Sequence, residues 1–206
     1  MNKFDLDTPS LLIDFNKLEN NIAQMQKIAD DNHVKLRPHT KTHKTPYISH
    51  MQIRAGARGI TCAKLGEAEV MNAAGVDDIL IAFPLQGASK MERLLRLAER
   101  AQMRVSLDSI KVAQDISDAA SQRGMKIPFY VEVDPGLHRV GLPPREATRD
   151  FVRAVTKLPE ATRSRAPAMG ELGNPIESSA SISTRTVPAA SLTQARAGPS
   201  VTRSPA

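Results

Sequence analysis

Short apolar runs alternate with amphipathic segments along the first 160 residues, and this alternation constrains the fold more than any other feature. Helical spacing of apolar residues predicts a first helix from about Phe15 to Asp31. Strand-like runs lie at 34–37, 59–63, 79–83, 104–108 and 128–133, and further helices are predicted around 46–56, 66–74, 88–101, 109–123 and 144–157. Such alternation favours a parallel sheet with right-handed crossovers, in either a doubly wound fold or a (β/α)8 barrel.

The number of strands sets a limit on this α/β fold. A complete barrel needs eight strands and about 250 residues. This chain has 206 residues, and its pattern ends near residue 160 after five strands. Residues 11–13 form another apolar run, read as a short strand, and Asp14 is a candidate cap for the helix that follows. We therefore expect an incomplete barrel with about five barrel strands.

The composition changes abruptly after residue 160. Residues 161–206 contain five Arg, two acidic residues and no Lys, His, Cys or aromatic residue. Such a segment cannot bury enough apolar surface to offset the entropy lost on ordering. Two interpretations stay open, a disordered tail or a stretch that is not the native continuation, as after a reading-frame shift. The predicted division is 1–160 for the α/β part and 161–206 for the tail.

Composition also argues against several partners. The net charge is +6, but part of the excess lies in 161–206 and the rest is close to balanced, so we expect no nucleic-acid partner. No apolar stretch approaches the ~20 residues that span a bilayer, and the N-terminus lacks an apolar signal segment, so we expect no membrane association. The single Cys62 cannot form an internal disulfide, which favours a cytoplasmic location.

A basic run at 36–45, Leu-Arg-Pro-His-Thr-Lys-Thr-His-Lys-Thr, is the most unusual stretch. It follows a predicted strand and precedes a helix, where α/β proteins place functional loops. If the extended conformation persists, Arg37, His39 and Lys41 project to one face, and their mutual repulsion favours the neutral, nucleophilic form of the lysine amine. Such a lysine forms a Schiff base with a carbonyl compound.

Two other readings of this run stay open. A cluster of Lys, His and Arg is often only a solvated basic loop. The four-residue spacing of His39 and His43 suits a metal site on a helix, but Pro38 argues against a helix here.

A second notable stretch, 131–141, places Glu132 and Asp134 on one face of a strand end and the apolar Val131 and Val133 on the other. In a barrel the carboxylates would then line the interior near the catalytic end. The alternative is that Asp134 only shapes the Gly-containing turn that follows.

Several runs, in order, resemble the D-threonine aldolase / D-serine dehydratase family of pyridoxal-phosphate (PLP) enzymes. They are Asp-Thr-Pro-Ser-Leu-Leu-Ile-Asp at 7–14, Arg-Pro-His-Thr-Lys-Thr-His-Lys at 37–44, Gly-Glu-Ala-Glu at 66–69, and Asp-Pro-Gly-Leu-His-Arg-Val-Gly at 134–141. The run at 37–44 is quite specific to the group. The resemblance covers about residues 5–160.

This resemblance implies a PLP-binding (β/α)8 TIM barrel of the alanine racemase type, with residues 10–14 belonging to a separate β-domain. It implies that Lys41 carries the cofactor and that His39, Arg37 and Arg139 are further cofactor contacts. The implied reaction is lyase cleavage of a small D-hydroxy amino acid or loss of water from it. A homodimer is the expected assembly of the complete fold.

The family also has features that we expect after residue 160 and do not find. These are a Thr-His motif, glycine-rich backbone that holds the phosphate, a C-terminal β-domain, and a His and a Cys that bind a divalent metal (Mn or Zn). We therefore expect no metal ligands in this chain, and an incomplete form with weak activity or none. Two alternatives stay open, a PLP-dependent amino-acid racemase of the same fold and a non-enzymatic anion- or PLP-binding protein.

Overall fold

The computed structural model describes residues 2–158, so the predictions made for 161–206 lie outside it. Four parallel strands form one sheet in the order β1-β2-β3-β4. The strands are β1 (Ile60–Cys62), β2 (Asp78–Ile81), β3 (Gln102–Leu107) and β4 (Phe129–Val131). The helices are α1 (Phe15–Asp31), α2 (Pro46–Arg54), α3 (Leu65–Ala73), α4 (Ala88–Ala98), α5 (Ile110–Ser121) and α6 (Glu146–Val155), with short 3₁₀ turns at Lys3–Asp5 and Thr40–Thr42. The predicted α/β class is confirmed.

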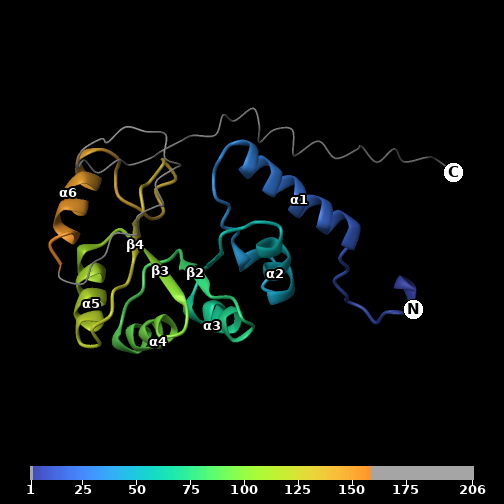
Figure 1. Ribbon diagram of the computed structural model, residues 1–206, viewed down its shortest axis with the longest axis horizontal. Coiled ribbons are helices and arrows are strands. Elements are labelled where there is room, and N and C mark those ends of the chain that lie inside the picture. The colour runs from blue at the N-terminus through green and yellow to red at the C-terminus, as the bar shows by residue number, and fades with distance from the viewer. Residues whose placement is uncertain (1, 159–206) are drawn as a thin grey trace. The chain divides into compact units, whose positions relative to one another are not determined.

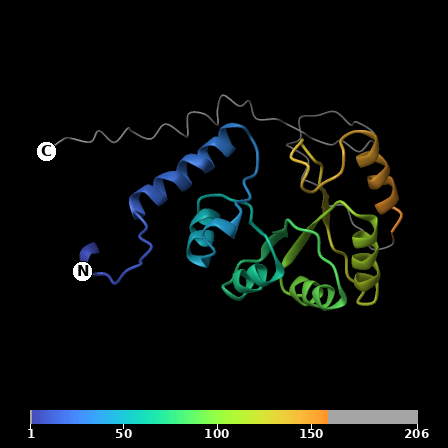
Figure 2. The same cartoon turned by 180° about the vertical axis from the view of Figure 1, so that it is seen from behind.

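The helices α3 to α6 cover one face of the sheet (Figures 1 and 2). Alternate strand residues such as Ile79, Ile81 and Val105 face these helices and form a single hydrophobic core with them. A doubly wound sheet carries helices on both faces, whereas the wall of a (β/α)8 barrel carries them on one. The packing therefore favours the barrel arrangement over the doubly wound one.

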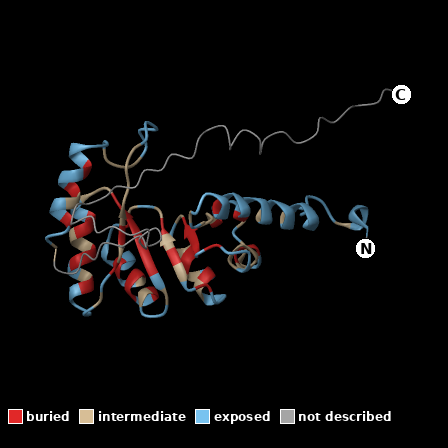
Figure 3. Cartoon of the chain, turned by 45° about the horizontal axis from the view of Figure 1, so that its top comes forward, coloured by how far each residue is buried: buried red, intermediate tan, exposed pale blue. Residues whose placement is uncertain are grey.

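The other face of the sheet is largely polar. Thr61, Leu80 and Arg104 stand side by side there in the strand register, and Ser106 stands opposite Tyr130. In a barrel this face is the interior, and Figure 3 shows how strongly the strands are buried compared with α1.

Helix α1 begins and ends where the sequence predicts. The side chain of Asp14 accepts a hydrogen bond from the Lys17 amide (3.1 Å), which satisfies one of the unpaired amides of the first turn. The helix ends at Asp31, and His33 then takes a left-handed conformation that turns the chain. In the described residues no helix is long and apolar enough to cross a membrane.

Two predicted strands differ in the structure. Residues 11–13 form no strand, and their side chains are largely exposed, because no neighbouring strand in the described part of the chain pairs with them. Residues 34–37 form no regular ladder either, but the adjoining segment runs parallel to β1. The carbonyls of Leu36 and Pro38 accept bonds from the amides of Arg58 and Thr61. This segment therefore lies beside β1, in the place of the first of the five predicted barrel strands.

Candidate active site at the carboxyl ends of the strands

Lys41 lies at the carboxyl end of the segment that runs beside β1. His39 forms a parallel bridge with Thr61, and the chain then enters the 3₁₀ turn Thr40–Thr42. Thr40 anchors this turn, because it is fully buried and its hydroxyl donates to the Thr61 carbonyl (3.2 Å). The turn therefore presents the exposed Lys41 side chain at the edge of the sheet where barrel enzymes place their active sites.

The two lysines of the turn have different surroundings. Lys44 Nζ lies 2.6 Å from Glu67 Oε1, and the Glu67 side chain is only 9% exposed. The Ala63 amide donates to the other carboxylate oxygen of Glu67 (2.8 Å). Lys41 has no ion-pair partner among residues 2–158. The structure therefore distinguishes an engaged lysine from one whose amine is available.

Burial, hydrogen bonds and nearby charges together shift the pKa values of the groups around Lys41. Burial lowers the pKa of His39, and the Lys41 ammonium lowers it further. A neutral imidazole agrees with the hydrogen bond that His39 Nδ1 accepts from the Lys41 amide (3.3 Å). Burial opposes ionisation of Glu67, but the bonds from Lys44 and Ala63 outweigh it and lower its pKa. Glu67 is therefore a carboxylate at neutral pH.

Cys62, beside this turn, has no role as a nucleophile in the structure. Its thiol is fully buried, and burial raises its pKa to about 11. The Thr40 hydroxyl lies 3.5 Å from its sulfur. A thiol that stays protonated and buried is chemically inert.

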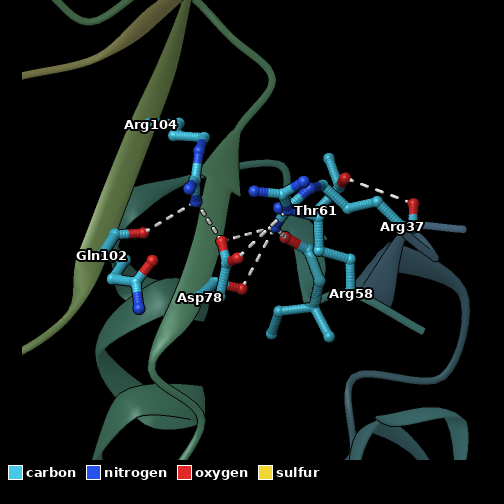
Figure 4. A network of polar contacts seen from close by, with 7 residues as sticks. Arg37, Arg58, Thr61, Asp78, Gln102 and Arg104 are labelled. Atoms are coloured by element: carbon cyan, nitrogen blue, oxygen red, sulfur yellow. Dashed lines mark hydrogen bonds and ion pairs between the residues drawn. The ribbon is translucent and has the colours of Figure 1, made fainter. Parts of the chain in front are cut away.

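Arg37 lies away from Lys41, at the amino ends of the strands (Figure 4). Its guanidinium contacts Asp78, the first residue of β2, at 2.9 Å, and also the Asp78 carbonyl. The expected common face of Arg37, His39 and Lys41 is not formed, because the 3₁₀ turn ends the strand alternation at Thr40. No contact of Arg37 supports its predicted place at the cofactor, which stays a prediction.

Asp78 is the centre of a buried charge cluster. Arg104 also contacts its carboxylate, and Arg58 Nε lies 3.9 Å away. A Cβ atom at Gly59 would lie 2.4 Å from the Asp78 carbonyl oxygen, so a glycine is needed for this close approach. Sequence reasoning missed the cluster, because its members are far apart in the chain and belong to four segments. The cluster joins the Leu36–His39 segment to β1, β2 and β3.

The loop after β4 carries Arg139 and is held by two carboxylates. Asp134 accepts the amides of Gly136 (2.9 Å) and His138 (3.0 Å) and lies 2.8 Å from the His138 ring, so it shapes the turn as the alternative reading expected. Asp108, which follows β3, accepts the Gly141 amide (3.0 Å). These bonds place the loop at the same edge of the sheet as Lys41.

Glu132 directly follows β4, at the beginning of this loop. Burial raises its pKa, repulsion from Asp108 raises it further, and Arg139 opposes the shift. Arg139 itself is exposed, on the loop that follows the carboxyl end of β4. No group of three or more His, Cys, Asp or Glu residues able to hold a metal is found in 2–158.

Sequence reasoning did not single out Glu67 as a site residue. It noted 66–69 only as part of a resemblance. One signal in the sequence could have found it. Glu67 lies in the first turn of a predicted helix, and that turn and the basic run at 36–45 both follow predicted strands, so they lie at the same edge of the sheet. Lys44 was likewise seen only as one member of that run.

The chain is similar in sequence and fold to several known proteins. D-threonine aldolase of Arthrobacter sp is 42% identical over 137 residues, which are 66% of this chain and 36% of that protein. The 3-hydroxy-D-aspartate aldolase of Paracoccus denitrificans is 31% identical over 79% of this chain and 42% of its own length. The crystal structure of D-threonine aldolase from Filomicrobium marinum matches with a TM-score of 0.75 and 38% identity, over 78% of this chain and 43% of that one.

The chain thus spans about two fifths of the length of these relatives. The family model for the N-terminal domain of alanine racemase matches residues 13–165, which include the sheet, its helices and both loops of the candidate site. By this match and by its relatives, the chain belongs to the alanine racemase N-terminal domain family.

Proposed function

We propose that this chain is part of a PLP-dependent lyase that acts on small D-hydroxy amino acids, with Lys41 as the covalent attachment point of the cofactor. The relatives named as D-threonine aldolase and 3-hydroxy-D-aspartate aldolase support the substrate class. The Delftia relative, named as a D-threo-3-hydroxyaspartate dehydratase, supports the same class through a different reaction.

One observation carries the proposal. At the carboxyl ends of the parallel strands, Lys41 is exposed and has no ion-pair partner in the described residues, whereas Lys44 on the same turn is bonded to Glu67. Covalent attachment of an aldehyde requires an amine whose electron pair is available. Glu67 occupies the Lys44 amine, whereas no carboxylate in the described residues pairs with Lys41.

The residues around Lys41 fit a cofactor of this kind. Lys41 supplies an amine, and Arg139, on the loop that Asp108 holds at the same edge of the sheet, would supply a guanidinium for an anionic oxygen. When bound, PLP supplies an electron sink for the bond that is broken. The glycine-rich phosphate site of the family is expected after residue 160, where the sequence of this chain shows none; those residues lie outside the described part of the structure.

The pKa shifts of His39 and Glu132 determine which protons and charges lie at this edge of the sheet. His39 stays neutral near pH 7, since burial and Lys41 both lower its pKa, so it adds no second positive charge beside the amine. It holds the Lys41 amide through Nδ1, and its ring proton is then on Nε2. Glu132, with its raised pKa, can hold a proton closer to neutral pH than an exposed glutamate does.

Borohydride trapping tests the proposal. The purified chain is mixed with PLP, reduced and mapped by peptide mass spectrometry, and the pyridoxyl group is expected on Lys41. The Lys41→Ala variant is expected to lose this label and Lys44→Ala to keep it. A label found on Lys44 or Lys64 instead would contradict the assignment.

The reaction class needs a separate measurement. D-threonine, D-serine and alanine are added separately to the cofactor-loaded protein, and the cofactor spectrum is followed. A lyase of the proposed kind changes its spectrum with the hydroxy amino acids. A response to alanine alone would favour the racemase alternative.

A further inference from the structure

The turn that carries Lys41 also carries a second lysine, so the chain must select between two amines. Lys44 is three residues further on, and its amine is held 2.6 Å from Glu67 Oε1. Glu67 is fixed in turn, because its side chain is nearly buried and its other oxygen accepts the Ala63 amide (2.8 Å). The acceptor of Lys44 is therefore a rigid group at the beginning of α3.

Condensation with an aldehyde requires an amine nitrogen with a free electron pair. The nitrogen electron pair attacks the carbonyl carbon, a C=N bond replaces the C=O bond, and the two nitrogen protons leave with the oxygen as water. No oxidation or reduction takes place. Before it can react, the Lys44 amine must leave its ion pair with Glu67, a step that Lys41, unpaired in the described residues, does not require.

The backbone adds to this selection. Lys44 takes a left-handed conformation, with φ of 55°, and its amide donates to the Thr40 carbonyl (2.7 Å). Thr40 fixes the beginning of the turn through its buried hydroxyl, and the Lys44–Glu67 pair fixes its end. Lys41 lies between these two anchors and its side chain is exposed.

We propose that Glu67 is a positioning residue that directs covalent attachment to Lys41, by holding Lys44 in an ion pair and with it the end of the turn. The inference rests on the proposed function, in which Lys41 attaches an aldehyde cofactor. It assigns to Glu67 a role in site selection that is separate from the attachment itself.

Competitive labelling tests this role in the full chain. Wild-type and Glu67→Gln proteins are treated with PLP at the same pH and reduced. The pyridoxyl yields on Lys41 and Lys44 are normalised to Lys90, which is exposed on α4. In Glu67→Gln we expect the Lys44 to Lys41 ratio to rise about fivefold, which corresponds to an ion pair at the upper end for partly exposed pairs.

The matched control is Glu69→Gln, on the same helix. Glu69 lies 2.6 Å from Arg93 and makes no bond to either lysine, so this variant loses an ion pair but should keep the wild-type ratio. Circular dichroism confirms that both variants are folded. If Glu67→Gln does not fold, the wild-type chain is labelled at increasing NaCl. Screening of the half-exposed pair should then raise the Lys44 share.

The outcomes separate the two proposals. Suppose that the wild type is labelled on Lys41. An unchanged Lys44 to Lys41 ratio in folded Glu67→Gln then overturns the role of Glu67 and leaves the proposed function standing. Where that variant does not fold, a Lys44 share that does not change with salt has the same meaning. An equal rise in Glu69→Gln also overturns it, because the effect would not be specific. Labelling mainly on Lys44 in the wild type overturns both.

Discussion

The charge cluster around Asp78 gives the sharpest stability prediction. Asp78 is the single carboxylate among three guanidiniums, and its side chain is 13% exposed, with Arg37 and Arg104 at 12% and 10%. The change Asp78→Asn keeps the size of the side chain and removes its charge. Three cations are then left close together, two of them nearly buried, at the amino ends of the strands (Figure 4).

The magnitude follows from the burial of the cluster. Removing one partner of a buried ion pair costs about 3–5 kcal/mol, because the remaining charge is desolvated without compensation. The asparagine keeps one oxygen that can accept a hydrogen bond, so we expect the lower end, about 3 kcal/mol of unfolding free energy. With a urea m-value of about 2 kcal/mol/M, this lowers the midpoint by about 1.5 M.

Urea unfolding followed by circular dichroism measures the effect. The matched control is Asp150→Asn, which removes an exposed pair with Arg153, whose side chains are 62% and 69% exposed, and should cost less than about 1 kcal/mol. In a double-mutant cycle, the variant with both Asp78→Asn and Arg37→Met should lose less unfolding free energy than the sum of the two single variants. Equal midpoints for the two asparagine variants would refute the reasoning, since the cluster would then be no stronger than a surface pair.

Three further predictions concern other parts of the molecule. Burial is the main cause that lowers the pKa values of His39 and His43 from the unfolded value of 6.5. As the pH drops below about 6.5 the unfolded state therefore takes up protons first, and the free energy of unfolding should fall. The double variant His39→Gln, His43→Gln should show a flatter dependence of stability on pH. Gly141→Ala should cost about 2 kcal/mol or more in thermal unfolding, because a Cβ there would lie 2.7 Å from a backbone nitrogen at a φ of 97°. The control Gly124→Ala, at a φ of 61° with no atom within 4 Å, should cost about 1 kcal/mol, and equal losses would contradict the steric argument. Cys62 should resist alkylation at pH 8 in the folded protein and react once urea unfolds it, because burial raises its pKa to about 11; rapid reaction of the native thiol would contradict this.

Local and periodic features of this chain could be predicted from the sequence. The helix from Phe15 to Asp31 has both apolar spacing and a capping aspartate, and the structure confirms its bounds. Four of the five predicted barrel strands form, because continuous apolar runs between helices suit a buried parallel sheet. The position of Lys41 at a strand end also follows from the order of elements, since parallel strands place all their carboxyl ends at one edge.

Only the tertiary structure decided which charged groups meet. The partners Lys44 and Glu67 are 23 residues apart, and Arg37 and Asp78 are 41 apart. No local pattern reports such pairs, because the sheet register and the helix packing bring them together. The sequence also predicts a strand at 11–13 that does not form. An apolar run shows a tendency to pair, but a strand forms only where a neighbour supplies the other half of its hydrogen bonds.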